Sequence, residues 1–316
     1  MTPSARSVPL HYSDVPQYLL LEGNPYKRGL IHGETLRSQI REVIARWKGE
    51  VAGMYKMDAD EVITRLVTRT DFIPAIQRWT PDLLDEIRGI SVGADMAWEI
   101  VLAFQLLDEM WSNEDIILAG HCSSLGIPVR GSEPAFVAQN VDVESSRDGF
   151  QVLLHIKHTD SDLESFVLST AGVIGFNGMN NHSVGLCCNA LLPLRGCRGG
   201  LPVACVVRGV LEKRTAQEAV TFLQTIRHAS GQNYIVGGQD KVVDLECSAT
   251  QVVQFEPAGP PGVVWHTNHP LANRDYHEWY QAENNPFLPN STTRYQSMER
   301  RLALPPRGAR LDQIKE

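Results

Sequence analysis

The sequence changes character at Cys122, and this change does most to limit the folds that the chain can adopt. Before Cys122, apolar residues recur at intervals of three and four, which is typical of amphipathic helices. After it, short apolar runs alternate with turn-forming clusters such as VRGSEP and GMNNHS, which predict a sheet of sequential antiparallel strands. Because helical segments then interrupt the strands, the pattern favours an α+β protein with helix–sheet–sheet–helix layers.

The first 121 residues are expected to be mainly helical. Thr80, followed by a proline and an acid, predicts a capped helix that ends near Gly93. A further helix is expected over residues 59–76, and the apolar stretch 97–111 predicts a buried helix. The apolar face of an earlier helix would be formed by Ile40, Val43, Ile44, Trp47 and Val51.

Strands and a few helices are expected after Cys122. Thr215 is predicted to cap a helix over residues 216–228, and a Gly-Gly-Gln-Asp turn is predicted to join two strands. Other helices are expected over residues 201–212 and 291–304. The predicted strands cover residues 122–127, 135–143, 150–158, 164–172, 173–179, 183–191, 233–238, 241–247 and 262–269.

Composition excludes several classes of protein. Of the 316 residues, 43% are hydrophobic, which is enough for a sizeable core. The formal net charge is −8 and the Lys and Arg residues are scattered, so we expect no nucleic-acid partner. The sequence has no recognisable secretory signal and no apolar run of membrane-spanning length, which predicts a cytoplasmic protein without a membrane partner. The six cysteines form no zinc-type pair, so we expect reduced thiols, no metal and no cofactor.

The segment GHCSSLGIP places a small nucleophile, Cys122, at the start of a predicted strand. By itself, such a cysteine is more often structural than catalytic. Four later segments place asparagine at the ends of predicted strands: AQNVDVE, GLCCNAL, SGQNYIVGG and WHTNHPL. Buried polar side chains at such positions need a reason, and they make Cys122 a candidate catalytic thiol.

Several spaced motifs resemble, in the same order, those of the isopenicillin N acyltransferase family of self-cleaving N-terminal-nucleophile enzymes. The motifs are AGHCSSLGI, AQNVDVE, GFNGMNNHSVGLCCNAL, NYIVGGQDKVVDLE and HTNHPL, and PYKRGLIHGETL at residues 25–36 is similar to the opening segment of that family. More remotely, Asn-x-Asp, Thr-Asn-x-Pro and Ser-x-x-Arg resemble bile-salt hydrolase and penicillin V acylase.

The resemblance implies a four-layer αββα sandwich that cuts itself into two associated parts. Residues 1–121 would form a helical leader, and residues 122–316 would form the catalytic part. The base would be the α-amino group of Cys122, which exists only after cleavage of the His121–Cys122 bond. An α-amine titrates near pH ~8, closer to neutrality than a lysine amine, so it can accept the thiol proton.

The resemblance also assigns roles to residues near the nucleophile. Cys122 would attack first the preceding peptide bond and then the carbonyl carbon of a substrate. Asp142 would hold the α-amine and thiol of Cys122 in position, with support from Asn140. Ordinary capping or strand-end roles are the structural alternatives for Asp142 and Asn140.

Oxyanion stabilisation would come from Asn268 and Asn189, the strand of Asn189 being expected beside the nucleophile. Asn189 has the alternative of an ordinary strand-end role. Arg294 would lie near the sulfur of Cys122 and lower the pKa of the thiol, and Ser291 is a weaker candidate for the same corner. A surface ion pair of little energetic value, with either Glu278 or Glu299, is the alternative for Arg294.

The histidines allow other interpretations. His32 is expected to be a packing residue of the leader. His266 and His269 flank Asn268, but two ligands at this spacing do not predict zinc. A cysteine peptidase that pairs Cys122 with a histidine is an alternative, and it would need His121, His266 or His269 beside the thiol.

Two departures from the family pattern concern the cleavage site and the end of the chain. His121 stands where the family usually has glycine, which tolerates a strained backbone. This histidine would either protonate the departing amine or slow cleavage. Family members commonly continue past RLDQIKE through an Asp-His segment, so a truncated C-terminus is one interpretation.

The favoured function is hydrolysis of a linear amide of an N-acyl or aminoacyl compound through a Cys122 thioester. Transfer of the acyl group from a thioester or amide to an amine is the enzymatic alternative, since water and amines compete for the same intermediate. A binding protein that kept the fold and lost processing is the non-enzymatic alternative. The expected partner is a small amide or acyl donor, and the sequence also allows the chain to form homo-oligomers.

Overall fold

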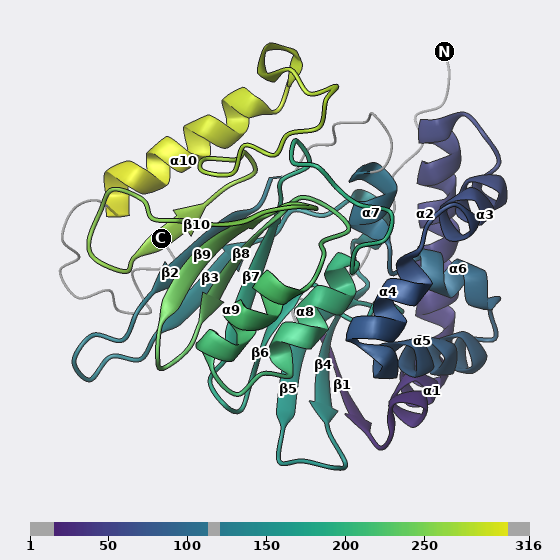
Figure 1. Cartoon of the computed structure of the whole chain (residues 1–316). Helices are drawn as coiled ribbons and strands as arrows, with labels where there is room; N and C mark the ends of the chain where they lie inside the picture. The colour runs from purple at the N-terminus through teal and green to yellow at the C-terminus, as the bar shows by residue number, and fades with distance from the viewer. Residues whose placement is uncertain (1–15, 113–120, 303–316) are drawn as a thin grey trace, which may run out of the picture.

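Two β-sheets form the centre of the structure (Figure 1). The computed structural model describes residues 16–112 and 121–302. Within these ranges, the large sheet has eight strands in the order β1-β4-β5-β6-β7-β8-β9-β10, and the small sheet has three in the order β11-β2-β3. The strands of the large sheet are β1 Gln17–Glu22, β4 Gln151–Lys157, β5 Glu164–Thr170, β6 Asn177–Asn180, β7 Gly185–Ala190, β8 Gln232–Gly237, β9 Val242–Cys247 and β10 Val252–Phe255. Those of the small sheet are β2 Ser123–Ile127, β3 Phe136–Asn140 and β11 Val264–His266.

The strand order confirms the predicted series of antiparallel strands from β4 to β9, and β10 extends it in the same antiparallel manner. β1 is the exception, because it pairs in parallel with β4 at the sheet edge. β2 and β3 leave the series and pair with β11. The strand that begins after Cys122 therefore belongs to the small sheet.

The small sheet packs on one face of the large sheet through β2, β3 and β11, which contact β7, β8 and β9. Side chains of Ile235, Val242 and Val264 fill the space between the sheets. Gly126 of β2 permits this close approach, because a Cβ there would lie 2.5 Å from Val242 Cγ1 and 2.8 Å from Ile235 Cγ2. The two sheets therefore enclose a small apolar cluster of their own, separate from the main core.

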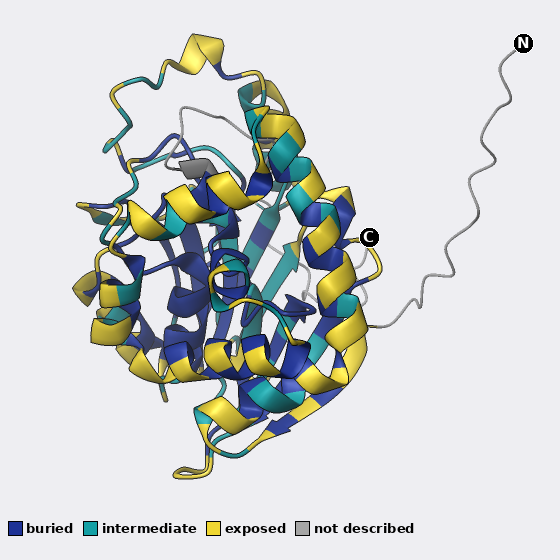
Figure 2. Ribbon diagram, turned by 90° about the vertical axis from the view of Figure 1, so that its right-hand side faces the viewer, coloured by how far each residue is buried: buried dark blue, intermediate teal, exposed yellow. Residues whose placement is uncertain are grey.

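Helices cover the outer surfaces of the two sheets. α8 and α9 pack on β6, β7 and β8, and α10 contacts β11 of the small sheet. Buried residues lie in the sheets and on the helix faces turned toward them (Figure 2). The protein is thus a mixed α+β structure with an N-terminal helical region and a large mixed sheet. The α-helices are α1 Pro25–Thr35, α2 Arg37–Tyr55, α3 Ala59–Thr68, α4 Phe72–Trp79, α5 Pro81–Ala94, α6 Trp98–Ala103, α7 Leu107–Ser112, α8 Val203–Leu211, α9 Ala216–Thr225 and α10 Leu288–Leu302, and the short 3₁₀ helices are η1 Ser145–Arg147 and η2 Ala282–Asn284. In the described ranges, no helix has the length and apolarity needed to cross a membrane.

Most predicted helices are present, but two predicted helices are each divided into two. The apolar face predicted around Trp47 is buried in α2, and Thr215 caps α9 by accepting a hydrogen bond from the Glu218 N–H. The helix expected over 59–76 breaks where the Asp71 N–H donates to Arg198 O at 2.7 Å, a tertiary bond that competes with the helix.

The helix expected over 97–111 breaks at Gln105. The buried Gln105 side chain donates to Gly172 O at 2.8 Å and accepts from the Ile174 N–H at 2.9 Å. The predicted cap of α5 is wrong in detail, since the Thr80 side chain makes no hydrogen bond to the first turn. β1 and β10 were not predicted. β1 is stabilised by pairing with the distant strand β4, and β10 has only four residues.

The segment PYKRGLIHGETL forms α1, which packs closely against α5. Gly29 and Gly33 of α1 face Gly89 and Gly93 of α5, and a Cβ on any of them would collide with backbone of the opposite helix. Nearby, the fully buried His32 accepts a hydrogen bond from the Gly172 N–H at 2.9 Å, and burial lowers its pKa to about 4. His32 therefore has the packing environment expected for it.

A buried ion cluster joins three helices of this region. Glu86 of α5 bonds to Arg208 of α8 at 2.5 Å and to Arg28 of α1 at 3.1 Å. Burial alone would raise the pKa of Glu86, but the charges and hydrogen bonds of Arg208 and Arg28 outweigh it and lower the pKa to about 2. Glu86 therefore stays ionised and ties the first helices to the layer that covers the large sheet.

Replacing Glu86 by glutamine should destabilise the protein by ~3–5 kcal/mol, since two buried guanidinium groups lose their counter-charge. Because the folded pKa of Glu86 lies below the unfolded one, its contribution is present above pH ~4.5 and is lost as pH falls toward ~2. Urea unfolding at pH 7 and at pH 3 measures both effects. Glu34→Gln, an exposed change on α1, is the control, and equal stabilities of the two variants would contradict the role of the cluster.

Candidate active site

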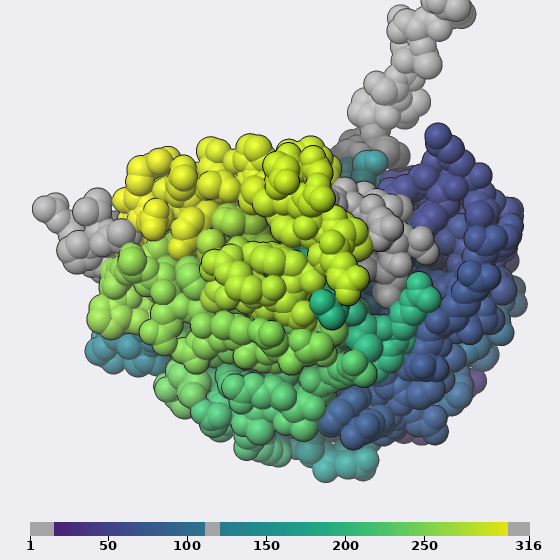
Figure 3. Space-filling view, turned by 45° about the horizontal axis from the view of Figure 1, so that its top comes forward, coloured from purple at the N-terminus to yellow at the C-terminus, as the bar shows by residue number. Residues whose placement is uncertain are grey.

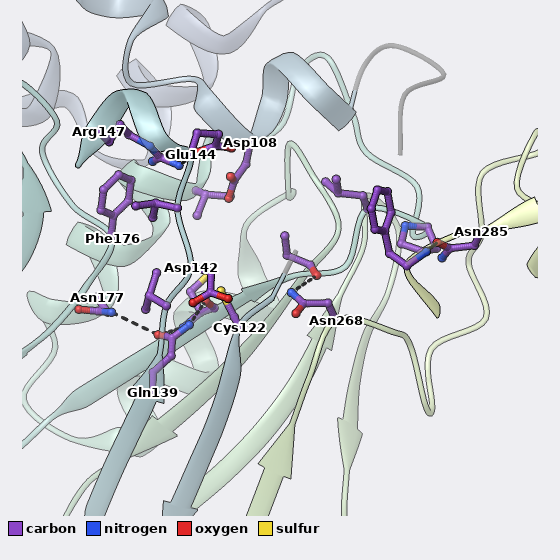
Figure 4. Close-up of a pocket in the computed structure, with 18 residues that line it drawn as sticks. Asp108, Cys122, Gln139, Asp142, Glu144, Arg147, Phe176, Asn177, Asn268 and Asn285 are labelled. Carbon is purple, nitrogen blue, oxygen red and sulfur yellow. Dashed lines mark hydrogen bonds and ion pairs between the residues drawn. The ribbon is translucent and has the colours of Figure 1, made fainter. Parts of the chain in front are cut away.

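A pocket of about 110 Å³ contains the Cys122 side chain (Figure 4). Its walls come from β3, β7, α7, α8 and the segments that follow β3 and β11. The segment before α10 also contributes to the pocket wall. Figure 3 shows α10 on the same face of the molecule as helices that precede Cys122. The lining residues are Asp108, Cys122, Gln139, Val141, Asp142, Val143, Glu144, Arg147, Phe176, Asn177, Cys188, Ala190, Leu192, Pro193, Val203, Asn268, Asn285 and Phe287.

Cys122 is half-buried immediately before β2. Burial raises the pKa of its thiol, and the negative charges of Asp108 and Asp142 act in the same direction. A hydrogen bond from the Asp142 N–H and the positive charge of Arg294 act against this rise. The thiol thus needs a nearby base or cation to become a nucleophile at neutral pH.

Asp142 and Asn140 occupy different places. Asn140 is the exposed last residue of β3, opposite Ser123 of β2, and it does not line the pocket. Asp142, two residues later, lines the pocket and lies beside Cys122 in Figure 4. Of the two predicted residues, Asp142 is the one whose side chain shares the pocket with the thiol.

Asn189 lies in β7 of the large sheet, which contacts β2, the strand that follows the nucleophile, from the facing sheet. It is fully buried, and its amide donates to Ser124 Oγ at 2.9 Å and to Thr267 O at 3.3 Å. Its carbonyl accepts from Gln139 Nε2 at 2.9 Å. These bonds engage both amide hydrogens of Asn189, which links the two sheets behind the pocket.

Asn268 lies on the turn after β11 and lines the pocket. Its side-chain amide donates to Ala190 O at 3.0 Å, which leaves the second amide hydrogen for another acceptor. Its backbone N–H donates to Ser291 Oγ at 2.8 Å, so Ser291 is a support of this turn. The buried Glu246 holds the same turn by accepting from backbone N–H groups of residues 271–273.

Arg294 projects from α10 toward the nucleophile. Its guanidinium donates to Cys122 O at 2.5 Å and to Ser123 Oγ at 3.0 Å. It also donates to Asn268 Oδ1 at 3.1 Å and to Asn290 Oδ1 at 2.8 Å. One cation therefore connects α10, the start of β2 and the turn of Asn268.

The histidines near the site bond to other groups. His121 lies 3.2 Å from Asn290 Oδ1 through Nδ1, and its ring packs edge-on against Phe287. The buried His266 bonds to Glu246 at 2.8 Å, and His269 bonds to Ser291 Oγ at 2.8 Å. Within residues 16–112 and 121–302, no group of three or more His, Cys, Asp or Glu could hold a metal ion.

Sequence reasoning missed the pocket residues contributed by distant segments. Gln139 accepts from the Cys188 N–H and from Asn177 Nδ2, so it is a structural bridge across the pocket wall. Asp108 and Arg147 also line the pocket. A signal for Asp108 was present, because Asp108 and Glu109 are adjacent acidic residues in a largely apolar stretch and need polar partners there.

A half-buried thiol that shares a pocket with a carboxylate and a carboxamide has the groups that nucleophilic acyl transfer uses. The model of the acyl-coenzyme A:6-aminopenicillanic acid acyl-transferase family matches residues 129–304, more than half of the chain. The chain therefore belongs to this family, which indicates acyltransferase or amidohydrolase activity. The match includes Asp142, Asn268 and Arg294 and begins after Cys122. No curated protein matches the chain significantly.

Replacing Arg294 by methionine should raise the pKa of the Cys122 thiol further, because the compensating cation is lost. We expect alkylation of Cys122 by iodoacetamide at pH 7.5 to slow by about three- to tenfold. Peptide mass spectrometry of timed samples measures the rate at this residue. Arg300→Met, an exposed change on the same helix, should leave the rate unaltered, and a wild-type rate in Arg294→Met would exclude the electrostatic role.

Proposed function

We propose that the protein is an N-terminal-nucleophile enzyme that cleaves its own His121–Cys122 bond and then hydrolyses a linear amide through a Cys122 thioester. The observation that carries this proposal is the position of Cys122, whose thiol lines a pocket together with Asp142 and Asn268. Arg294 supports the same conclusion, because it bonds to Cys122 O and to the Asn268 side chain.

The proposed fold is the four-layer αββα sandwich of N-terminal-nucleophile hydrolases. Two stacked sheets with α8 and α9 outside the large sheet and α10 outside the small one support this proposal. Residues 1–121 would become the small subunit and residues 122–316 the large one. The two would stay associated, since β1 is a strand of the large sheet and Glu86 bonds to Arg208.

Self-cleavage would begin with attack of the Cys122 thiol on the carbonyl carbon of His121. The bond from this carbon to the Cys122 nitrogen breaks, the nitrogen takes a proton, and a thioester links His121 to the sulfur. Water then hydrolyses the thioester, which leaves a carboxylate on His121 and a free amine on Cys122. Asn290 positions the His121 side chain during this step, since the two bond in the intact chain.

The catalytic cycle would use the new amine of Cys122 as the base. The amine takes the thiol proton as the sulfur attacks the substrate carbonyl, and Asp142 stabilises the resulting ammonium. The free amide hydrogen of Asn268 stabilises the oxyanion. Asn189 and Asn140 would act indirectly, because neither lines the pocket. The ammonium gives its proton to the leaving nitrogen and the amine product departs. Water then hydrolyses the thioester, which releases the acyl group as a carboxylic acid and restores the thiol.

Acyl transfer is the second candidate, and the description of the matched family favours it. It differs from hydrolysis only in the final acceptor, an amine in place of water. A Cys–His peptidase gains no support, because His266 bonds to Glu246 and His269 to Ser291.

The wild-type chain should separate into two bands on a denaturing gel, whereas Cys122→Ala should give one. Edman sequencing of the larger fragment should begin with Cys122. His121→Gly restores the usual family residue and should cleave at least as fast as wild type, since glycine permits the strained backbone. A single wild-type band after prolonged incubation would rule out self-cleavage under those conditions.

Asp142→Asn should reduce kcat for hydrolysis of an acyl 4-nitroanilide by about 100-fold or more, since the ammonium of Cys122 loses its counter-charge. We expect KM to change little. Asp148→Asn, an exposed change nearby, is the matched control. Equal kcat values for the two variants would remove Asp142 from the proposed mechanism.

A further inference from the structure

Acidic groups outnumber basic groups in the pocket. Within the described parts of the chain, its charged lining consists of Asp108, Asp142, Glu144 and Arg147. In Figure 4, Asp108, Glu144 and Arg147 group together, while Cys122 lies beside Asp142. The pocket therefore has a reactive end at the thiol and a second, acidic end.

The cation at the acidic end is engaged by Glu144. Arg147 is buried, forms an ion pair with Glu144, and packs its guanidinium over the Phe176 ring at 5.1 Å. Among residues 16–112 and 121–302, Arg147 forms no ion pair with Asp108. The charge of Arg147 still acts on Asp108, although the hydrogen bond and ion pair of Arg147 are made with Glu144.

Asp108 is the carboxylate left for a ligand. Its Oδ2 accepts from Gln232 Nε2 at 3.0 Å. Burial raises its pKa, although the charge of Arg147 acts against the rise. Its neighbour Glu109 has a pKa raised to about 8 by burial and by the charge of Asp108. Among the described residues Asp108 therefore has a hydrogen bond from Gln232 but no ion-pair partner, and a cationic ligand would supply one.

Part of the remaining wall is apolar. It includes Val143, Phe176, Leu192 and Val203, which suit the methylene groups of a short chain. During the proposed reaction the acyl group stays in the pocket as a thioester, whereas the amine product departs. A group bound at the acidic end would therefore be held through both steps if it belonged to the acyl part of the substrate.

We infer that Asp108 binds a protonated amine on the acyl part of the substrate, so that the protein acts on aminoacyl amides. This inference deepens the proposed function and rests on it. Asp108 lies on α7, before the cleavage site, so the N-terminal fragment supplies the specificity-determining residue for a thiol on the C-terminal fragment. An ammonium bonded to this half-buried carboxylate should favour such substrates by about 10- to 100-fold.

The first test compares isosteric 4-nitroanilides that differ only in an ammonium or a methyl group. The pairs are glycyl and propanoyl, 3-aminopropanoyl and butanoyl, and 4-aminobutanoyl and pentanoyl. Wild type should prefer the aminoacyl member of at least one pair by tenfold or more in kcat/KM. Asp108→Asn should abolish this preference and spare the neutral member, while Asp148→Asn should preserve the preference.

Asn at position 108 still accepts the hydrogen bond of Gln232, so the variant should fold, and thermal unfolding checks this. An equal loss for both members of a pair would overturn the inference. In that case Asp108 would act on the ammonium of Cys122 itself. A wild-type preference for the neutral members would overturn it as well.

The second test does not need turnover. Butylammonium should protect Cys122 from iodoacetamide, and its neutral isostere 1-butanol should not, because Cys122 and Asp108 line the same pocket. Asp108→Asn should raise the butylammonium concentration required by about tenfold or more. If wild type cleaves no anilide but butylammonium protects through Asp108, the proposed hydrolysis fails while the amine site stands. Equal protection by both probes would overturn the amine site whatever the hydrolysis result.

Discussion

Gln139 makes hydrogen bonds between the two sheets. These bonds hold together the part of the structure where the pocket lies. Gln139 of β3 donates to Cys188 O at 2.5 Å and to Asn189 Oδ1 at 2.9 Å, both on β7. Asn189 extends the link to Ser124 of β2. These buried polar groups satisfy one another, so the sheets have a fixed register at this end. The position of Cys122, directly before β2, depends on that register.

Residues far apart in the sequence supply the chemistry of the pocket. Arg294 of α10 connects the carbonyl of Cys122 with Asn268, and Glu246 of β9 holds the turn that carries Asn268. Asp108 comes from the N-terminal helices. The part of the chain before Cys122 therefore does more than cover the core. It completes the pocket, adds β1 to the large sheet and joins Glu86 to Arg208.

The sequence predicted the reactive end of this pocket better than its acidic end. Cys122, Asp142, Asn268 and Arg294 occur in short motifs, and the structure brings them to one place, although their catalytic roles stay predictions. Asn189 was expected on a strand beside the nucleophile, and β7 does contact β2. That β7 does so from the facing sheet could not be predicted, because periodicity within a strand cannot tell a neighbouring strand from one in a facing sheet.

Long-range contacts explain most other differences. Local propensity favoured one helix over 59–76, but the bond from Asp71 to Arg198 interrupts it. β1 could not be predicted because its stability comes from parallel pairing with a strand more than a hundred residues away. Asp108 carried a visible signal as an acid in an apolar helix, but only the fold shows that it reaches the pocket of Cys122.

The central claim is that Cys122 becomes an N-terminal residue that carries the acyl group. The most direct measurement is top-down mass spectrometry of wild-type protein quenched in acid during turnover of an acyl 4-nitroanilide. Our account predicts a fragment that begins at Cys122 and carries one acyl group on that residue. An unmodified fragment, or an acyl group on another residue of an intact chain, would contradict it.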